Sequence, residues 1–160
     1  MTKRKEAIGM YDERMELDES KFKMNITAEE AIMGYKETND DEDLVNIIMA
    51  LRRTLLYVPI NKSKLVEINR EYANVIPVIE EDKLPIITKT TDGCMWFTSF
   101  TRKQFIPVEF SKYEIKEFTF QDILLLCIGI KGIDGLDINV GHETHINLEN
   151  YLTKEIIELL

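Results

Sequence analysis

The sequence predicts an α+β fold: one domain with a mostly antiparallel, mixed sheet and helices packed on it. Three observations predict it. Helical patterns open and close residues 26–160, short apolar runs separated by turn residues lie between them, and several of these runs alternate with period two. With 160 residues, of which 44% are apolar, the chain is long enough to bury a core.

The charge pattern divides the chain in two. Residues 1–25 are expected to form a loosely ordered acidic leader, and residues 26–160 the single domain. Residues 6–43 hold 13 acids against four bases, whereas residues 44–160 hold 16 acids against 13 bases. This distribution repels a phosphate backbone, so nucleic-acid binding is not expected. The acidic stretch is either a surface for a basic partner or a solvated face that keeps the protein soluble.

Two helices are expected in residues 27–55. Thr27 and Glu30 form a capping box, which predicts a helix to about Thr38. The Asn39-Asp40-Asp41 cluster then ends this helix and starts the next. In the second helix, apolar residues recur at helical spacing from Leu44 to Leu55, with acids in the first turn and Arg52-Arg53 in the last.

The middle of the chain predicts strands. Leu55–Ile60 is an apolar run that Pro59 is expected to end. Further strands are expected at 75–79 and 85–90, and an Asp92-Gly93 hairpin turn leads into a strand at 94–98.

The remaining elements follow from caps and alternation. A second capping box, Thr101 to Gln104, predicts a short helix, and Thr119 with Asp122 predicts an apolar helix ending near Ile130. Asn147 is the expected cap of a closing amphipathic helix. Strands are expected at 108–110, 113–118 and 136–140.

The chemistry-bearing residues do not define a catalytic site. The sequence has no GxSxG elbow and no glycine-rich phosphate loop, and Cys94 and Cys127 fall in predicted apolar elements. We therefore expect a non-enzymatic protein with no cofactor. The longest apolar run is far too short to span a bilayer, and the first 20 residues do not form a signal peptide, so a cytoplasmic protein is expected.

Two sets of residues are candidates for binding. The first is a protein-binding surface that joins acids to aromatic residues expected to be exposed near loop ends: Asp40, Asp41, Asp43, Tyr57, Trp96 and Phe97. Packing in the core is the alternative for the aromatic residues. The second is a small-ligand or metal-binding module in the loop after the strand at 136–140: Asn139, His142, Glu143 and His145. The two histidines lack the i, i+4 spacing of a HExxH helix, so no metal ligand is assigned. An ordinary polar loop explains the same residues.

Several short blocks occur in a recognisable order: Ala50-Leu51-Arg52-Arg53, Leu56-Tyr57-Val58-Pro59, Asp92-Gly93, Phe97-Thr98-Ser99, the helix after Thr119, and Gly135-Leu136-Asp137-Ile138-Asn139-Val140-Gly141. Together they resemble the N-terminal domain of the SseB family, named for enhanced serine sensitivity in bacteria. The resemblance covers about residues 40–160 and departs from the family at Val140, where proline is usual. It implies a bacterial cytoplasmic α+β domain and no established catalytic residues.

Overall fold

The computed structural model describes residues 26–62, 70–72 and 83–159, and these residues form one α+β domain. The elements in chain order are α1 (Ala28–Thr38), α2 (Asp41–Leu51), β1 (Leu55–Lys62), η2 (Arg70–Tyr72), β2 (Lys83–Pro85), β3 (Ile87–Lys89), β4 (Met95–Ser99), η3 (Lys103–Phe105), η4 (Val108–Phe110), β5 (Glu114–Thr119), α3 (Phe120–Gly129), β6 (Gly135–Ile138), β7 (Ile146–Glu149) and α4 (Asn150–Leu159). The expected leader and the strand expected at 75–79 lie outside the described residues.

The strands form two sheets where the sequence predicted one. The three-stranded sheet has the order β2-β1-β5 and is antiparallel throughout. The four-stranded sheet has the order β3-β4-β6-β7, in which β4 and β6 are parallel and the other pairs are antiparallel. Tyr57 of β1 and Phe100 after β4 join the sheets through two backbone hydrogen bonds of 2.8 Å.

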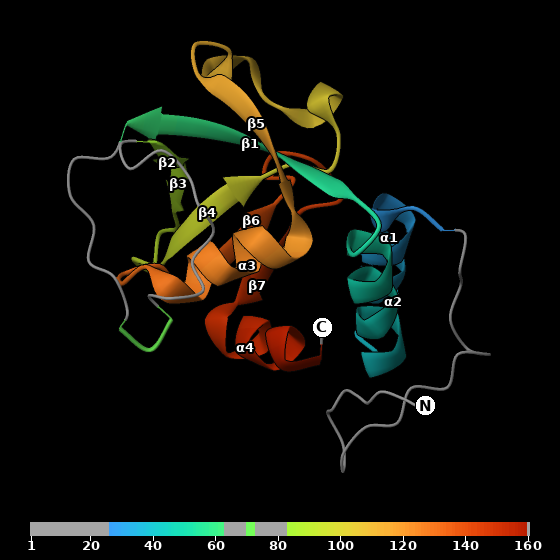
Figure 1. Ribbon diagram of the computed structural model, residues 1–160. Helices are drawn as coiled ribbons and strands as arrows, with labels where there is room; N and C mark the ends of the chain where they lie inside the picture. Colours follow the sequence, from blue (N-terminus) through green and yellow to red (C-terminus); the bar gives the residue numbers. More distant parts are fainter. Residues whose placement is uncertain (1–25, 63–69, 73–82, 160) are drawn as a thin grey trace.

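The helices form two groups. α1 and α2 pack against each other as a hairpin, and β1 leads from this hairpin into the sheets (Figure 1). α3 lies over β6 and also contacts α4. Most of its side chains are buried, including Ile123, Leu124 and Leu126, because it lies between the sheet and α4. The resulting core is continuous from Ile32 of α1 to Ile156 of α4.

The predicted caps of the first three helices are confirmed. The Thr27 hydroxyl accepts the amide hydrogen of Glu30, and the Glu30 carboxylate accepts that of Thr27. Asn39 ends α1 in the left-handed conformation, at a φ of 54°, and the Asp40 side chain caps α2. The Thr119 hydroxyl caps α3 by accepting the amide hydrogen of Asp122.

The predicted end of the second helix is corrected. α2 ends at Leu51, so Arg52 and Arg53 follow its last turn. Arg53 still binds that end, because one of its terminal nitrogens donates to the Met49 carbonyl at 3.0 Å. The positive charge that the sequence predicted at the C-terminal end of the helix dipole therefore comes from Arg53, just beyond the helix.

Pro59 does not end β1, which continues to Lys62. The Pro59 carbonyl accepts the Ile86 amide hydrogen at 2.9 Å, so the backbone N and O of Pro59 face away from β5. Although Pro59 stands opposite Ile115 in the β1–β5 pair, its missing N–H removes no hydrogen bond from that ladder.

Three other local predictions are corrected. Residues 108–110 form the 3-10 helix η4, not a strand, since the carbonyls of Pro107 and Val108 accept bonds from residues three positions on. The short helix predicted after Thr101 is present as the 3-10 helix η3 (Lys103–Phe105), but it starts without a side-chain cap from Arg102. Asn147 lies in β7, and the closing helix begins at Asn150.

The predicted Asp92-Gly93 turn is confirmed. The Gly93 amide donates to the Thr90 carbonyl at 2.9 Å, and Gly93 has a φ of 92°, which favours glycine. Within the described residues, no helix has both the length and the apolar character needed to cross a bilayer.

The backbones of β6 and β7 approach so closely that position 135 requires glycine. A Cβ added to Gly135 would lie 2.1 Å from the Leu148 carbonyl oxygen and 2.9 Å from the Glu149 Cα. We expect Gly135→Ala to lower the free energy of unfolding by at least about 2 kcal/mol, because these backbone atoms must shift.

The matched control is Gly34→Ala, within α1. An added Cβ there would meet Asp43 Oδ1 at an ordinary 3.8 Å, so we expect a gain of about 0.5–1 kcal/mol from helix propensity. Urea unfolding of both variants measures the difference. Equal effects of the two substitutions would contradict the close approach of β6 and β7.

Candidate functional site

A surface pocket of about 430 Å³ opens where the start of α1 meets the start of β1 and the segment that follows β4. We call it the α1 pocket. It is lined by Thr27, Ala28, Glu29, Thr54, Tyr57, Thr101, Arg102, Lys103 and Gln104. Its volume falls within the range of small-molecule and peptide sites.

Thr101 connects the pocket to the interior. It follows β4, is 5% exposed, and its hydroxyl donates to the Glu29 carboxylate of α1. Its amide donates to Asn139 Oδ1 at 2.9 Å. The capping box predicted at Thr101 is therefore wrong, because this hydroxyl binds α1 and Asn139 instead of the amide of Gln104.

Asn139 lies at the centre of a buried hydrogen-bond network. Its side chain is fully buried, and Nδ2 donates to the hydroxyls of Thr101 at 3.0 Å and Thr144 at 2.9 Å. Its φ of 61° is in the left-handed region, which asparagine tolerates better than most residues. Its own amide donates to the Ser99 carbonyl at 2.9 Å, which continues the β4–β6 pairing.

The network extends to His142. The Thr144 amide donates to His142 Nδ1 at 3.2 Å, and the Thr144 hydroxyl lies 2.7 Å from the same nitrogen. A backbone N–H can only donate, so Nδ1 accepts and the neutral ring carries its proton on Nε2. The ring of Phe105 stacks on His142, with centroids 3.9 Å apart and planes 24° apart. Residues 139–144 are thus tied to the η3 segment beside the α1 pocket.

Lys36 ties α1 to the same loop. Its Nζ donates to the carbonyl oxygens of Glu143 at 2.9 Å and His145 at 3.0 Å. Together with the Glu29–Thr101 hydrogen bond, this contact fixes α1 to the loops at the ends of β4 and β6.

Glu29 and Arg102 form an ion pair at the pocket. Arg102 Nε lies 3.3 Å from Glu29 Oε2, and the two side chains are 50% and 16% exposed. Burial pushes the pKa of Glu29 up, but hydrogen bonds, including that from Thr101, and the Arg102 charge outweigh it, so the pKa lies below its ordinary value. Glu29 is therefore ionised and already engaged.

Asp137 and His145 form a second pair on the four-stranded sheet. The Asp137 carboxylate is 2% exposed, contacts His145 Nε2, and accepts from Asn147 Nδ2 at 2.9 Å. Asp137 of β6 stands directly opposite Asn147 of β7, so the sheet register sets this arrangement. Burial raises the pKa of Asp137 above its ordinary value, although His145 offsets part of the shift.

The loop residues predicted to bind a small ligand are not gathered around a shared opening. Asn139 is buried in the network, His142 bonds to Thr144, and His145 pairs with Asp137, while Glu143 is exposed. Within the ranges that the structure describes, no group of three or more His, Cys, Asp or Glu side chains could hold a metal ion. Ligand binding by this loop stays a prediction.

The acids predicted to bind a partner lie at the α1–α2 junction. Asp40 caps α2, the Asp43 carboxylate accepts from the Thr38 hydroxyl, and Asp41 is exposed. Asp40 therefore caps α2, and Asp43 links α2 to α1. A role of the three acids in binding stays a prediction.

The predicted exposure of the aromatic residues is corrected. Trp96 is 6% exposed and Phe97 1%. The reason is that β4 lies inside its sheet: Phe97 packs into the core, and Trp96 Nε1 donates to the Thr90 hydroxyl at 3.4 Å. Tyr57, another aromatic residue of the predicted surface, is half-buried and lines the α1 pocket, where a partner can reach it.

The cysteines occupy different environments. Cys127 is fully buried in α3, and burial raises its pKa. Cys94 is half-buried beside the Asp92 turn, and burial together with Asp92 raises its pKa. Neither thiol has the lowered pKa that marks a reactive cysteine.

Sequence reasoning missed the pocket residues Glu29, Thr101, Arg102 and Lys103. They come from segments 72 residues apart, and neither segment carries a motif for the contact between them. Asn139 offered one signal, since asparagine is among the few residues that adopt the left-handed conformation at a turn.

Comparison with known proteins adds no relative: no family model, no curated protein and no solved structure matches the chain. The SseB resemblance therefore stays a prediction from the sequence.

The Asp137–His145 pair gives a testable pH dependence. A carboxyl whose pKa is higher in the folded chain stabilises the fold most when protonated, below its ordinary value of 3.8, and this stabilisation is lost as pH rises through the folded pKa. We expect the stability of the wild type relative to Asp137→Asn to fall as pH rises above 3.8, the ordinary value of the carboxyl pKa, since an amide does not titrate. Urea unfolding at each pH measures it. A difference that rises with pH would show that the Asp137 pKa is lowered.

Proposed function

We propose that this chain is a non-enzymatic protein-binding module, and that it receives part of its partner in the α1 pocket. The observation that carries the proposal is the α1 pocket itself, about 430 Å³ in volume and built on a buried hydrogen-bond network. Sites that bind with useful affinity are usually formed before the ligand arrives, which limits the entropy lost on binding.

The walls of the pocket are held in place from behind. Glu29 is fixed by Thr101 and Arg102, and Thr101 is fixed in turn by Asn139. On another wall, the Thr54 hydroxyl donates to the Ala50 carbonyl at 2.8 Å, which anchors the start of β1 to the end of α2. A partner would therefore meet a surface whose main polar groups already have defined positions.

An SseB-like domain is part of this proposal. Two of the blocks that carry the resemblance contribute to the pocket or to its support: Tyr57 lines the pocket, and Asn139 holds Thr101. The α+β architecture agrees with what the resemblance implies.

To test the proposal, peptides that bind the wild-type chain are selected from a random displayed library. Their affinities are then measured for the wild type and for a variant in which a larger side chain fills the pocket. Gln104→Trp places an indole at an exposed position of the pocket lining. We expect the selected peptides to lose at least about tenfold in affinity, which corresponds to about 1.4 kcal/mol.

Gln121→Trp is the matched control, because Gln121 is equally exposed but lies on α3, outside the pocket lining. The control should bind the peptides as the wild type does. Peptides that bind both variants equally well, or a selection without enrichment, would contradict the proposal.

A further inference from the structure

We infer that the α1 pocket recognises a carboxylate of the partner, presented by an acidic side chain or by a peptide C-terminus. This inference rests on the proposed function and names the chemistry of the bound group. It comes from the charged residues that line the pocket: Arg102, Lys103 and Glu29.

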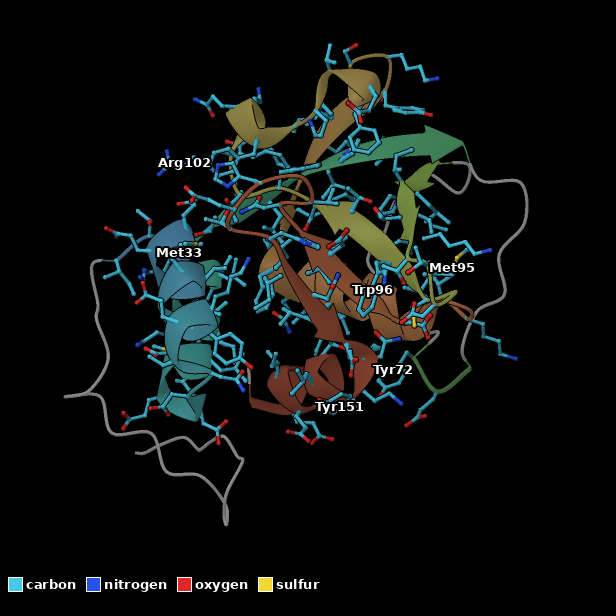
Figure 2. All side chains as sticks on the ribbon, turned by 180° about the vertical axis from the view of Figure 1, so that it is seen from behind. Met33, Tyr72, Met95, Trp96, Arg102 and Tyr151 are labelled. Atoms are coloured by element: carbon cyan, nitrogen blue, oxygen red, sulfur yellow. The ribbon has the colours of Figure 1, made fainter. Side chains whose placement is uncertain are left out.

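The Arg102 guanidinium has binding capacity left over. Its contact with Glu29 uses Nε, at 3.3 Å. The two terminal nitrogens of a guanidinium carry four further N–H groups, in a geometry that matches a carboxylate. Figure 2 shows Arg102 at the edge of the molecule, between the start of α1 and η3, where an incoming group has access to it.

Lys103 supplies a second positive charge. It is exposed, and its Nζ lies 5.7 Å from the centre of the Tyr57 ring, within the range of a cation–π contact. This contact places the ammonium over a residue of the pocket lining without neutralising it.

Glu29 does not reverse the sign of the pocket. Its carboxylate is held by the Thr101 hydroxyl and by Arg102, so it acts as the internal counter-ion of Arg102. The charged groups of the lining therefore sum to one positive charge, on a chain whose formal net charge is −9. A cationic group entering the pocket would face Arg102 and Lys103 with no unengaged carboxylate in the lining.

The surroundings of the pocket favour a single carboxylate over a polyanion. Glu30 is exposed beside the pocket on α1, and the chain as a whole is acidic. A long phosphate backbone would bring many negative charges close to this acidic surface and would be repelled by it. A single carboxylate is attracted by Arg102 and Lys103 and meets little of that repulsion.

The experiment is an amide NMR titration of the full chain with three five-residue peptides. The first is acetyl-Ser-Gly-Glu-Gly-Ser-amide, the second has Gln in place of Glu, and the third is the Gln peptide with a free C-terminal carboxylate. We expect at least one of the two carboxylate peptides, the first or the third, to shift the amide signals of Glu29, Tyr57 and Lys103. Comparing the affinities of these two peptides shows whether a side-chain or a C-terminal carboxylate binds better. The neutral second peptide should bind at least about tenfold more weakly than the better of them.

The diagnostic variant is Lys103→Gln, since no hydrogen bond or ion pair of the described structure depends on its ammonium. It should weaken the carboxylate peptide about tenfold, and Arg102→Gln at least as much. The matched control is Lys112→Gln: Lys112 is also exposed and its Nζ lies 5.3 Å from the Tyr113 ring centre, but it is outside the pocket lining.

The outcomes separate this inference from the proposed function. If the neutral peptide shifts the same amides with equal affinity, or if Lys112→Gln weakens binding as much as Lys103→Gln, the carboxylate inference is overturned while a peptide-binding pocket stands. If none of the three peptides shifts the pocket amides, the inference is overturned, and the displayed-peptide selection with Gln104→Trp then decides the proposed function separately.

Discussion

The structure depends on one buried side chain that joins segments far apart in the sequence. Asn139 binds the Thr101 amide and hydroxyl on one side and the Thr144 hydroxyl on the other, with no exposure to solvent. Buried polar groups that lose their partners cost about 1–3 kcal/mol each, so these bonds strongly favour one arrangement of the loops. Through Thr101 the same arrangement reaches Glu29 and thereby sets one wall of the α1 pocket.

This dependence connects the fold to the α1 pocket. The pocket lies where α1, β1 and the segment after β4 meet, and the elements are held there by contacts across the fold: Lys36 to the loop carbonyls, Tyr57 to Phe100, and Glu29 to Thr101. Each of these contacts joins residues that are distant in sequence. The geometry of the α1 pocket is consequently a property of the folded domain, and no single segment determines it.

The parts of the fold that depend on local chemistry were predictable. The caps at Thr27, Asp40 and Thr119 use residues within three positions, and the sequence located all three. The capping box at Thr101 and the cap at Asn147 failed because their side chains bind across the fold, to Asn139 and Asp137 respectively. For the same reason the candidate site was predicted only in part: Tyr57 lies in the pocket, but the pairing of Glu29 with Arg102 depends on tertiary structure.

The most direct test of this account is amide hydrogen exchange at Thr101 in the wild type and in Asn139→Gly, which keeps a residue suited to positive φ. The Thr101 amide binds the Asn139 side chain, whereas the Tyr57 amide binds the Phe100 carbonyl and serves as an internal reference. The account predicts that Thr101 is protected in the wild type and exchanges at least about tenfold faster in the variant, relative to Tyr57. Exchange at Thr101 that is unprotected in the wild type, or unchanged by the substitution, would contradict the role of Asn139 as the group on which the site depends.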